Sequence, residues 1–278
     1  MLRKLLFMVY TVILFSINLY SQETKVRIGT FNIEWLGNGE NDTIIRNDDD
    51  YKAISQIIST IDCDILAIQE VEDTIALQKV LKNCKNSYSF VIDPTSNNLL
   101  KTAILYKNSF SKLDVQFVNL SNSDKNHYNR PAIYLKLKVQ NKDIEVITLH
   151  LKSNSKKSKD FKNAPEVRSK QVKELLKWIQ DNGKSNSILI GDFNEEYSEN
   201  GNLYKIEKKL SSDVVTKNQY SCLYTKKKSI DHLIVPSKLK TTIVENSIQM
   251  FNHNALTNSK LKRKISDHCL VFFTLLIP

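Results

Sequence analysis

The sequence predicts an α/β fold in which two packed β-sheets are covered by helices. Apolar segments with strand or helix periodicity alternate from Val26 to Pro278. No linker divides them, because the chain of 278 residues holds only 6 glycines and 5 prolines, and these are scattered. Few of the many strands are separated by a helix, which favours two packed sheets over a doubly wound sheet.

The N-terminal segment is set apart from the fold because it has the layout of a secretory signal peptide. A short basic region precedes an apolar stretch from Leu5 to Phe15, which is shorter than the ~20 residues that span a membrane. We expect residues 1–21 to be removed by cleavage near Ser21 or Gln22, with an uncleaved anchor as the alternative. One domain, 22–278, would then be secreted or periplasmic.

The first half of the domain begins with elements that follow from periodicity. In the segment 51–61 isoleucines recur at helical spacing on one face, whereas short apolar runs bounded by polar residues are typical of strands. In chain order, we expect a strand from Val26 to Trp35, a helix from Tyr51 to Ile61, a strand from Asp64 to Gln69, a helix from Asp73 to Asn83, and strands from Lys101 to Lys107 and from Leu113 to Leu120.

The second half opens with two long strands joined by a tight turn and continues with an amphipathic helix closed by Gly183. A lysine run near residue 227 is expected at the tip of a hairpin. In chain order, the expected elements are strands from Arg130 to Val139 and from Ile144 to Leu151, a helix from Pro165 to Asn182, a strand from Ser187 to Gly191, a hairpin of Tyr220–Tyr224 with Ile230–Val235, and a terminal strand from His268 to Ile277.

The composition is that of a globular protein with a basic surface. Hydrophobic residues make up 41% and charged residues 25%, which excludes disordered, collagen-like and coiled-coil classes. The 40 basic and 30 acidic residues give a net charge of +10, and removal of Arg3 and Lys4 with the leader leaves +8. This excess favours an anionic partner such as nucleic acid or a membrane surface.

The four cysteines allow three disulfide connectivities, which spacing cannot separate. A bridge between Cys63 and Cys84 is the first candidate because these two close a short loop, and buried free thiols are the alternative. The chain contains no C-x-x-C motif, which argues against a structural zinc site.

Polar residues recur where the apolar strands stop. If these strand ends converge, their carboxylates, amides and imidazoles form one pocket that can hold a hard divalent cation, polarise a phosphate and activate a water. The residues concerned are Asn32, Glu34, Glu70, His150, Lys152, Asp192, Asn194, Asp231, Asp267 and His268.

Taken in chain order, these motifs resemble those of the endonuclease/exonuclease/phosphatase superfamily, the deoxyribonuclease I-like family. The resemblance covers about 26–278, and its most specific signals are Gly-Asp-Phe-Asn at 191–194 and Ser-Asp-His at 266–268. It implies a four-layer α-β-β-α sandwich with two packed mixed β-sheets and a site at one edge of both sheets.

The resemblance also implies a divalent-metal site. Glu70 matches the glutamate that binds the metal, Asn32 matches an asparagine beside it, and Asp267 matches a residue at the metal edge. Magnesium is the expected ion, with manganese or calcium as alternatives. Glu34, in the first of these motifs, is expected to face outward or to bond to backbone.

The catalytic roles implied by the resemblance fall on five residues. Asp192 matches the aspartate that aligns or deprotonates the attacking water, and Asn194 matches its amide partner at the phosphate. His268 matches the histidine on the scissile phosphate, oriented by the carboxylate of Asp231. His150 matches the second histidine, near the phosphate or leaving group.

Two basic residues are the candidates for substrate binding. Arg130 resembles a strand-start arginine that touches substrate phosphate in some members. Lys152 lies in a histidine–lysine–serine segment similar to that of secreted bacterial nuclease-like members. Lysine-rich runs at 156–157, 226–228 and 262–264 would add contacts to phosphates that do not depend on base sequence.

The activity implied is that of a metal-dependent phosphodiesterase, and the basic rim favours a nuclease of low sequence specificity. Such an enzyme would cleave DNA or RNA by in-line attack of an activated water, as a monomer that needs no protein partner. The alternatives are a sphingomyelinase-like or inositol-phosphate hydrolase and a non-catalytic anion-binding module. The charged tip of the expected hairpin, Lys226–Ser229, disfavours a membrane-lipid substrate.

Overall fold

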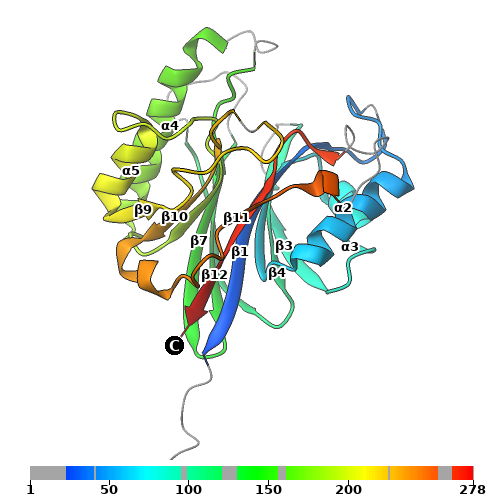
Figure 1. The fold of residues 1–278 in the computed structure, drawn as a ribbon, viewed down its shortest axis with the longest axis horizontal. Coiled ribbons are helices and arrows are strands. Elements are labelled where there is room, and N and C mark those ends of the chain that lie inside the picture. Colours follow the sequence, from blue (N-terminus) through cyan, green and yellow to red (C-terminus); the bar gives the residue numbers. More distant parts are fainter. Residues whose placement is uncertain are drawn as a thin grey trace, which may run out of the picture.

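Two β-sheets pack face to face in the computed structural model, with helices on both outer faces (Figure 1). The structure describes residues 23–40, 42–94, 99–120, 130–155, 161–224, 226–255 and 265–277. The expected signal peptide and the lysine runs at 156–157 and 262–264 therefore lie outside the described residues. The four-layer sandwich of two mixed sheets is confirmed.

The first sheet has six strands in the order β11-β12-β1-β2-β4-β3. β1 pairs with β2 in parallel and with β12 in antiparallel orientation, so the sheet is mixed. The strands are β1 (Thr24–Leu36), β2 (Ile65–Val71), β3 (Tyr88–Ile92), β4 (Lys101–Lys107), β11 (Gln249–Phe251) and β12 (Leu270–Ile277).

The second sheet has the order β5-β6-β7-β8-β10-β9. It is also mixed, because β7 and β8 run parallel while β8 and β10 run antiparallel. Its strands are β5 (Ser111–Val118), β6 (Ala132–Val139), β7 (Lys142–His150), β8 (Ile188–Asp192), β9 (Ser212–Val214) and β10 (Asp231–Pro236).

Helices begin where polar side chains can cap them. Asn47 accepts from the backbone N–H groups of Asp49 and Asp50, and Asp73 accepts from Ala76 N–H. The helices are α2 (Asp48–Ile61), α3 (Thr74–Leu81), α4 (Ala164–Asp181) and α5 (Asn202–Leu210), with 3₁₀ turns η1 (Phe161–Asn163), η2 (Ser237–Thr242) and η3 (His253–Ala255). No helix in the described ranges is both long and apolar enough to cross a membrane.

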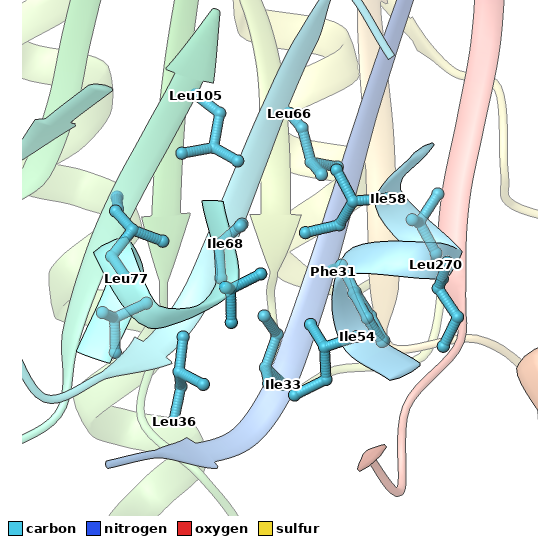
Figure 2. Packing of buried hydrophobic residues seen from close by; sticks show 14 of the residues in the cluster. Phe31, Ile33, Leu36, Ile54, Ile58, Leu66, Ile68, Leu77, Leu105 and Leu270 are labelled. Atoms are coloured by element: carbon cyan, nitrogen blue, oxygen red, sulfur yellow. The ribbon is translucent and has the colours of Figure 1, made fainter. Parts of the chain in front are cut away.

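Three clusters of buried hydrophobic residues hold the two sheets and the helices together. Figure 2 shows the first, in which Phe31, Ile54 and Ile68 pack between the first sheet and α2. A second fills the space between the two sheets, and a third joins the second sheet to α4 and α5. Because apolar contact is made on both faces of each sheet, the central strands are nearly continuous runs of buried residues.

Buried polar side chains link the two sheets below one rim. Thr30 Oγ1 donates to Gln69 Oε1 at 3.1 Å, and Gln69 Nε2 donates to Thr148 Oγ1 at 3.4 Å. These groups come from β1, β2 and β7, and all three are buried. Hydrogen bonding compensates for their burial and fixes the positions of the strands that end at this rim.

The expected hairpin around the lysine run is wrong. The segment before it forms a loop in which Tyr220 makes only an isolated bridge to Lys228, whereas β10 pairs with β8 and β9. The sequence analysis also missed α5 and the short strands β3, β9 and β11. The short strands lie at or next to the sheet edges, where fewer apolar residues are needed and the sequence pattern is weak.

The disulfide expected first is also wrong. Cys222 and Cys269 form the bridge, while Cys63 is a buried free thiol and Cys84 is a half-buried one. The bridge spans 47 residues of sequence and joins the loop that precedes β10 to the residue directly after His268. The pairing depends on this tertiary contact, and chain spacing therefore gave no signal for it.

Candidate active site

Strand register brings the polar strand ends to one rim. Asn32 on β1 pairs in register with Gln69 on β2, so Glu70 follows beside it. In the second sheet, His150 and Asp231 both pair in register with Asp192. In Figure 1, β1 starts at the lower end of the sheets, where β12 finishes, so these polar ends meet at the upper rim.

The backbone at this rim adopts a conformation that is uncommon outside glycine. Glu34, Trp35, Glu70 and Asn194 have φ values of 51°, 60°, 66° and 51°. Side chains of the site hold these turns, because Asn32 Oδ1 accepts from Glu34 N–H at 3.0 Å and Glu70 Oε2 accepts from Trp35 N–H at 3.1 Å. Strained backbone of this kind is found where a site is positioned by its surroundings.

Gly191 allows β8 to approach β7 closely, just before Asp192. Its φ is 148°, and a Cβ atom at this position would lie 2.0 Å from the carbonyl oxygen of Leu149. No other residue fits this backbone without moving β7, on which His150 is the next residue after Leu149. The glycine in the Gly-Asp-Phe-Asn motif is thus explained by strand packing.

The triad, which we define as Asp192, Asp231 and His268, lies at the centre of the rim. His268 Nδ1 lies 2.8 Å from Asp231 Oδ2, and His268 Nε2 lies 3.9 Å from Asp192 Oδ2. Burial by itself would lower the pKa of His268, but the two carboxylates outweigh it and raise the pKa well above 6.5. At neutral pH, His268 therefore carries a positive charge at this rim.

Asp192 is the buried carboxylate that the other site residues surround. Its Oδ1 accepts from Asn194 N–H at 2.8 Å, and its Oδ2 accepts from Asn32 Nδ2 at 3.0 Å. Burial raises the pKa of Asp192 to about 7, although His268 opposes this rise. A carboxylate with a pKa near neutrality is suited to accept a proton from water.

His150 and Arg130 lie on the second-sheet side of Asp192. Arg130 Nη1 lies 2.9 Å from each ring nitrogen of His150, and His150 Nε2 lies 3.4 Å from Asp192 Oδ2. Burial, aided by the charges of Arg130 and His268, holds the pKa of His150 well below 6.5. The neutral tautomer that suits both neighbours has its hydrogen on Nε2 and accepts from Arg130 at Nδ1.

The acidic edge, which we define as Glu34, Glu70 and Asp267, lies on the first-sheet side of the triad. Glu70 Oε1 lies 3.4 Å from Asn32 Nδ2 and 4.0 Å from His150 Nε2, and Asp267 Oδ1 lies 3.7 Å from His268 Nε2. Burial, with the charges of Asp267 and Glu70, raises the pKa of Glu34 to about 7 against the opposing charge of Arg46. Glu34 and Asp267 line the same pocket, so Glu34 does not point outward as expected.

The residues at the acidic edge have side chains of the kind that bind a divalent cation. Three carboxylates and the amide of Asn32 offer oxygen atoms, which are the ligands that magnesium and calcium prefer. Burial, followed by the charge of Asp267, raises the pKa of Glu34, and a positive ion would oppose both effects.

A second arrangement could also hold a metal, because single ligand atoms of the three triad residues lie within 4.8 Å of one another. In the described part of the chain, Asp231 Oδ1 is buried without a hydrogen-bond partner and could serve as a ligand. A metal there would, however, displace the 2.8 Å contact between His268 and Asp231. Among the described residues, the triad is the one group of three or more His, Cys, Asp or Glu whose ligand atoms lie this close together.

Two supporting residues were given no role in the sequence analysis. Buried Arg46 donates to the carbonyl oxygens of Ile33, Glu34 and Ile265 at 2.7, 2.8 and 3.2 Å, so it joins the end of β1 to the segment before His268. Ser266 Oγ donates to Asn32 O and accepts from His268 N–H at 2.9 Å. An arginine in a polar loop gives no sequence signal of such a role.

Asn194 and Lys152 differ from their expected positions. Asn194 Nδ2 donates to Leu151 O at 3.1 Å, so this amide joins two strand ends. Lys152 is only 6% exposed rather than on an open rim, and Arg168 donates to its carbonyl oxygen at 2.8 Å. A phosphate-binding role for Lys152 stays a prediction, whereas Arg168 supports the loop after β7.

Comparison with solved structures shows which proteins share this fold. A humanized D. rerio TDP2 with 14 mutations is 17% identical with a TM-score of 0.65, over 91% of this chain and 99% of that chain. A Bacteroides vulgatus endonuclease/exonuclease/phosphatase is 16% identical with a TM-score of 0.65, over 92% of this chain and 100% of that chain. The human Nocturnin catalytic domain with bound sulfate is 18% identical with a TM-score of 0.62, over 92% of this chain and 98% of that chain. At these identities the likeness establishes the fold alone.

A search of curated proteins found no match. The sequence profile described as the Endonuclease/Exonuclease/phosphatase family matches residues 29–268, a range that contains every strand end described above. The chain therefore belongs to the Endonuclease/Exonuclease/phosphatase family.

Proposed function

We propose that the protein is a secreted, divalent-metal-dependent nuclease of low sequence specificity. Members of its family hydrolyse phosphoesters. The observation that carries the proposal is the meeting of a proton-accepting carboxylate, a charged imidazole and a crowded set of carboxylates at one rim. These are the groups needed to attack an anionic phosphodiester with water.

The protein residues divide the chemistry between them. Asp192 accepts a proton from the attacking water, and Asn32 holds the Oδ2 atom of this carboxylate in place. Imidazolium His268, oriented by Asp231, offsets the negative charge that grows on the phosphoryl oxygens. Water oxygen forms the new bond to phosphorus as the bond to the leaving oxygen breaks.

The metal would be held by Glu70, Asn32 and Asp267, with magnesium as the expected ion. When bound, such an ion neutralises phosphate charge and lowers the pKa of water. His150 presents Nε2–H toward the same space. Burial, aided by the charge of Arg130, keeps this imidazole neutral, and the contact with Arg130 orients it.

A nucleic acid is the favoured substrate because the chain is basic and the rim offers phosphate-binding groups. Among proteins of the same fold, D. rerio TDP2 has been solved in complex with a single strand DNA product, at 15% identity and a TM-score of 0.64. The Cys222–Cys269 disulfide supports a location outside the reducing cytosol.

A substrate panel tests the proposal. Pure protein with magnesium is incubated with plasmid DNA, ribosomal RNA, sphingomyelin and an inositol phosphate, and each assay is repeated with a chelator. We expect chelator-sensitive cleavage of DNA or RNA. Turnover of sphingomyelin or the inositol phosphate alone would replace the nuclease by a lipid or inositol-phosphate hydrolase, and no turnover of any substrate would favour an anion-binding module.

A further inference from the structure

A pocket of about 560 Å³ lies beside the acidic edge. Its size is within the range of small-molecule sites. It is lined by Glu34, Ile44, Leu223, Tyr224, Asn254, Ser266 and Asp267.

One wall of the pocket is continuous with the candidate active site. Glu34 and Asp267 belong to the acidic edge, and Asp267 Oδ1 lies 3.7 Å from His268 Nε2. A phosphate held at His268 would therefore place the group attached to it at the mouth of this pocket.

The rest of the lining includes aromatic and aliphatic side chains. Tyr224 is 50% exposed although it lines the pocket, and Leu223 and Ile44 line it as well. An exposed aromatic ring offers a flat surface on which another ring can stack.

The loop that carries Leu223 and Tyr224 is tied covalently to the segment that carries His268. The Cys222–Cys269 disulfide ties it to the residue that follows His268. Ser221 Oγ accepts from the backbone N–H groups of Leu223 and Tyr224, each at 3.2 Å. Because the loop is held in place, stacking on Tyr224 requires little additional ordering.

We propose that Tyr224, Leu223 and Ile44 form a stacking surface for one unstacked nucleobase adjacent to the scissile phosphate. This inference rests on the proposed function and adds the form of the substrate. Bases of any sequence stack on aromatic side chains, which agrees with low sequence specificity. Lys227 Nζ lies over the face of the Tyr224 ring, 5.1 Å from its centre. A base that stacks on this face would displace the ammonium group, which is then available to a phosphate.

A preference for single strands follows from this geometry. A base in a duplex must leave its stack before it can reach Tyr224, which costs a few kcal/mol. A single strand, or the frayed end of a duplex, avoids this cost. The enzyme should therefore cleave single-stranded oligonucleotides faster than a blunt duplex of the same sequence.

Variants of two matched tyrosines test the inference. Tyr224→Ala removes the stacking ring, Tyr224→Phe keeps it, and Tyr220→Ala is the control because Tyr220 is 51% exposed on the same loop but does not line the pocket. Each is assayed for hydrolysis of a single-stranded oligonucleotide, of the same backbone built from abasic residues, and of a blunt duplex. Binding of the oligonucleotide is measured by fluorescence anisotropy in an Asp192→Asn background, where turnover is blocked.

We expect Tyr224→Ala to weaken binding and raise KM by about 10- to 100-fold on the base-containing strand, with Tyr224→Phe and Tyr220→Ala near wild type. On the abasic strand, wild type and Tyr224→Ala should be alike, since the stacked partner is missing. An equal loss on both strands, or no loss on either, overturns the inference, as does equal cleavage of single strand and duplex.

The arms of this test separate the inference from the proposed function. Tyr224-dependent binding of the oligonucleotide without any cleavage supports the stacking surface and rejects the nuclease. Cleavage that Tyr224→Ala leaves unchanged rejects the stacking surface alone. Sedimentation with sphingomyelin and phosphatidylcholine vesicles tests whether exposed Tyr224 binds a membrane surface instead. Tyr224-dependent binding to vesicles but not to oligonucleotide would overturn the inference.

Discussion

The triad and the acidic edge differ in how their charges are compensated. In the triad, two carboxylates surround one imidazolium, and the 2.8 Å contact between Asp231 and His268 fixes the geometry. In the acidic edge, burial and the charges of Asp267 and Glu70 raise the pKa of Glu34 to about 7. The charges of the triad are therefore balanced by its own residues, whereas a cation would relieve the repulsion among the carboxylates of the acidic edge.

Asn32 connects these two regions. Its Nδ2 donates to Asp192 Oδ2 at 3.0 Å and lies 3.4 Å from Glu70 Oε1. A side chain shared in this way couples the position of the proton acceptor to the position of the proposed metal ligand. Variants on either side should therefore have separable effects on chemistry and on metal binding.

The largest effect is expected from removal of the proton acceptor. Asp192→Asn and His268→Ala should each lower kcat by about 10²–10³-fold or more, because each removes a group that acts on charge in the transition state. Kinetics of oligonucleotide hydrolysis measures the loss, and circular dichroism checks the fold. A variant with a near-wild-type rate would remove its residue from the mechanism.

The stability of Asp192→Asn gives an independent check on the same residue. Because the pKa of Asp192 is raised by burial, its contribution to stability is present below its unfolded pKa of ~3.9 and is lost as pH rises through about 7. At pH 8 the Asn variant should therefore have a Tm at least equal to that of wild type. A clearly lower Tm would mean that the ionised carboxylate is well stabilised in the fold.

A somewhat smaller effect is expected at the acidic edge. Glu70→Gln should raise the magnesium concentration for half-maximal activity by about 10- to 100-fold, because a lost ligand should cost at least as much as a lost outer-shell partner. Magnesium titration of activity and of Tm measures it. Asp64→Asn is a suitable control, since that carboxylate pairs with Lys107 away from the rim. Unchanged titrations for Glu70→Gln would exclude it as a ligand.

The pH dependence of activity tests the charge of His268 in the triad. The two carboxylates raise the pKa of His268, so His268 stays protonated to a pH well above 6.5, and activity should fall as pH rises through that pKa. Asp231→Asn removes one of these charges and should move this alkaline fall to lower pH. Profiles of kcat/KM against pH measure the shift, and an unmoved alkaline limb would show that another group controls it.

The smallest effect on chemistry is expected from the disulfide, which lies outside both regions. Cys222→Ser should lower the free energy of unfolding by about 2–4 kcal/mol while the triad stays assembled. Cys84→Ser, at a free thiol, is the control. Urea denaturation compares them, and a loss in Cys222→Ser no larger than in Cys84→Ser would contradict a structural role for the bridge.

The sequence analysis identified the fold and the strand ends because both depend on local patterns. Buried strands such as β2 and β8 appear as apolar runs, and the next residues, Glu70 and Asp192, interrupt them. The start of α2 was placed three residues late, because its first turn is acidic and capped by Asn47, without apolar periodicity. The shorter helix α3 was found because Asp73 caps it, whereas α5 begins after Gly201 without a side-chain cap and was missed.

Features that depend on long-range contact could not be read from the chain. Arg46 is joined to Ile265 across 219 residues, and Cys222 to Cys269 across 47. The burial of Glu34 and Lys152 likewise depends on which loops cover them. In each case the partners are set by tertiary packing, and neither residue type nor spacing carries that information.

The central claim, that the two regions meet around one cation at the acidic edge, is tested most directly by anomalous diffraction from crystals soaked in Mn²⁺. We expect a single strong peak bounded by Glu70, Asn32 and Asp267, with the contact between His268 and Asp231 intact. A peak among Asp192, Asp231 and His268, or no peak at this rim in crystals that diffract well, would contradict it.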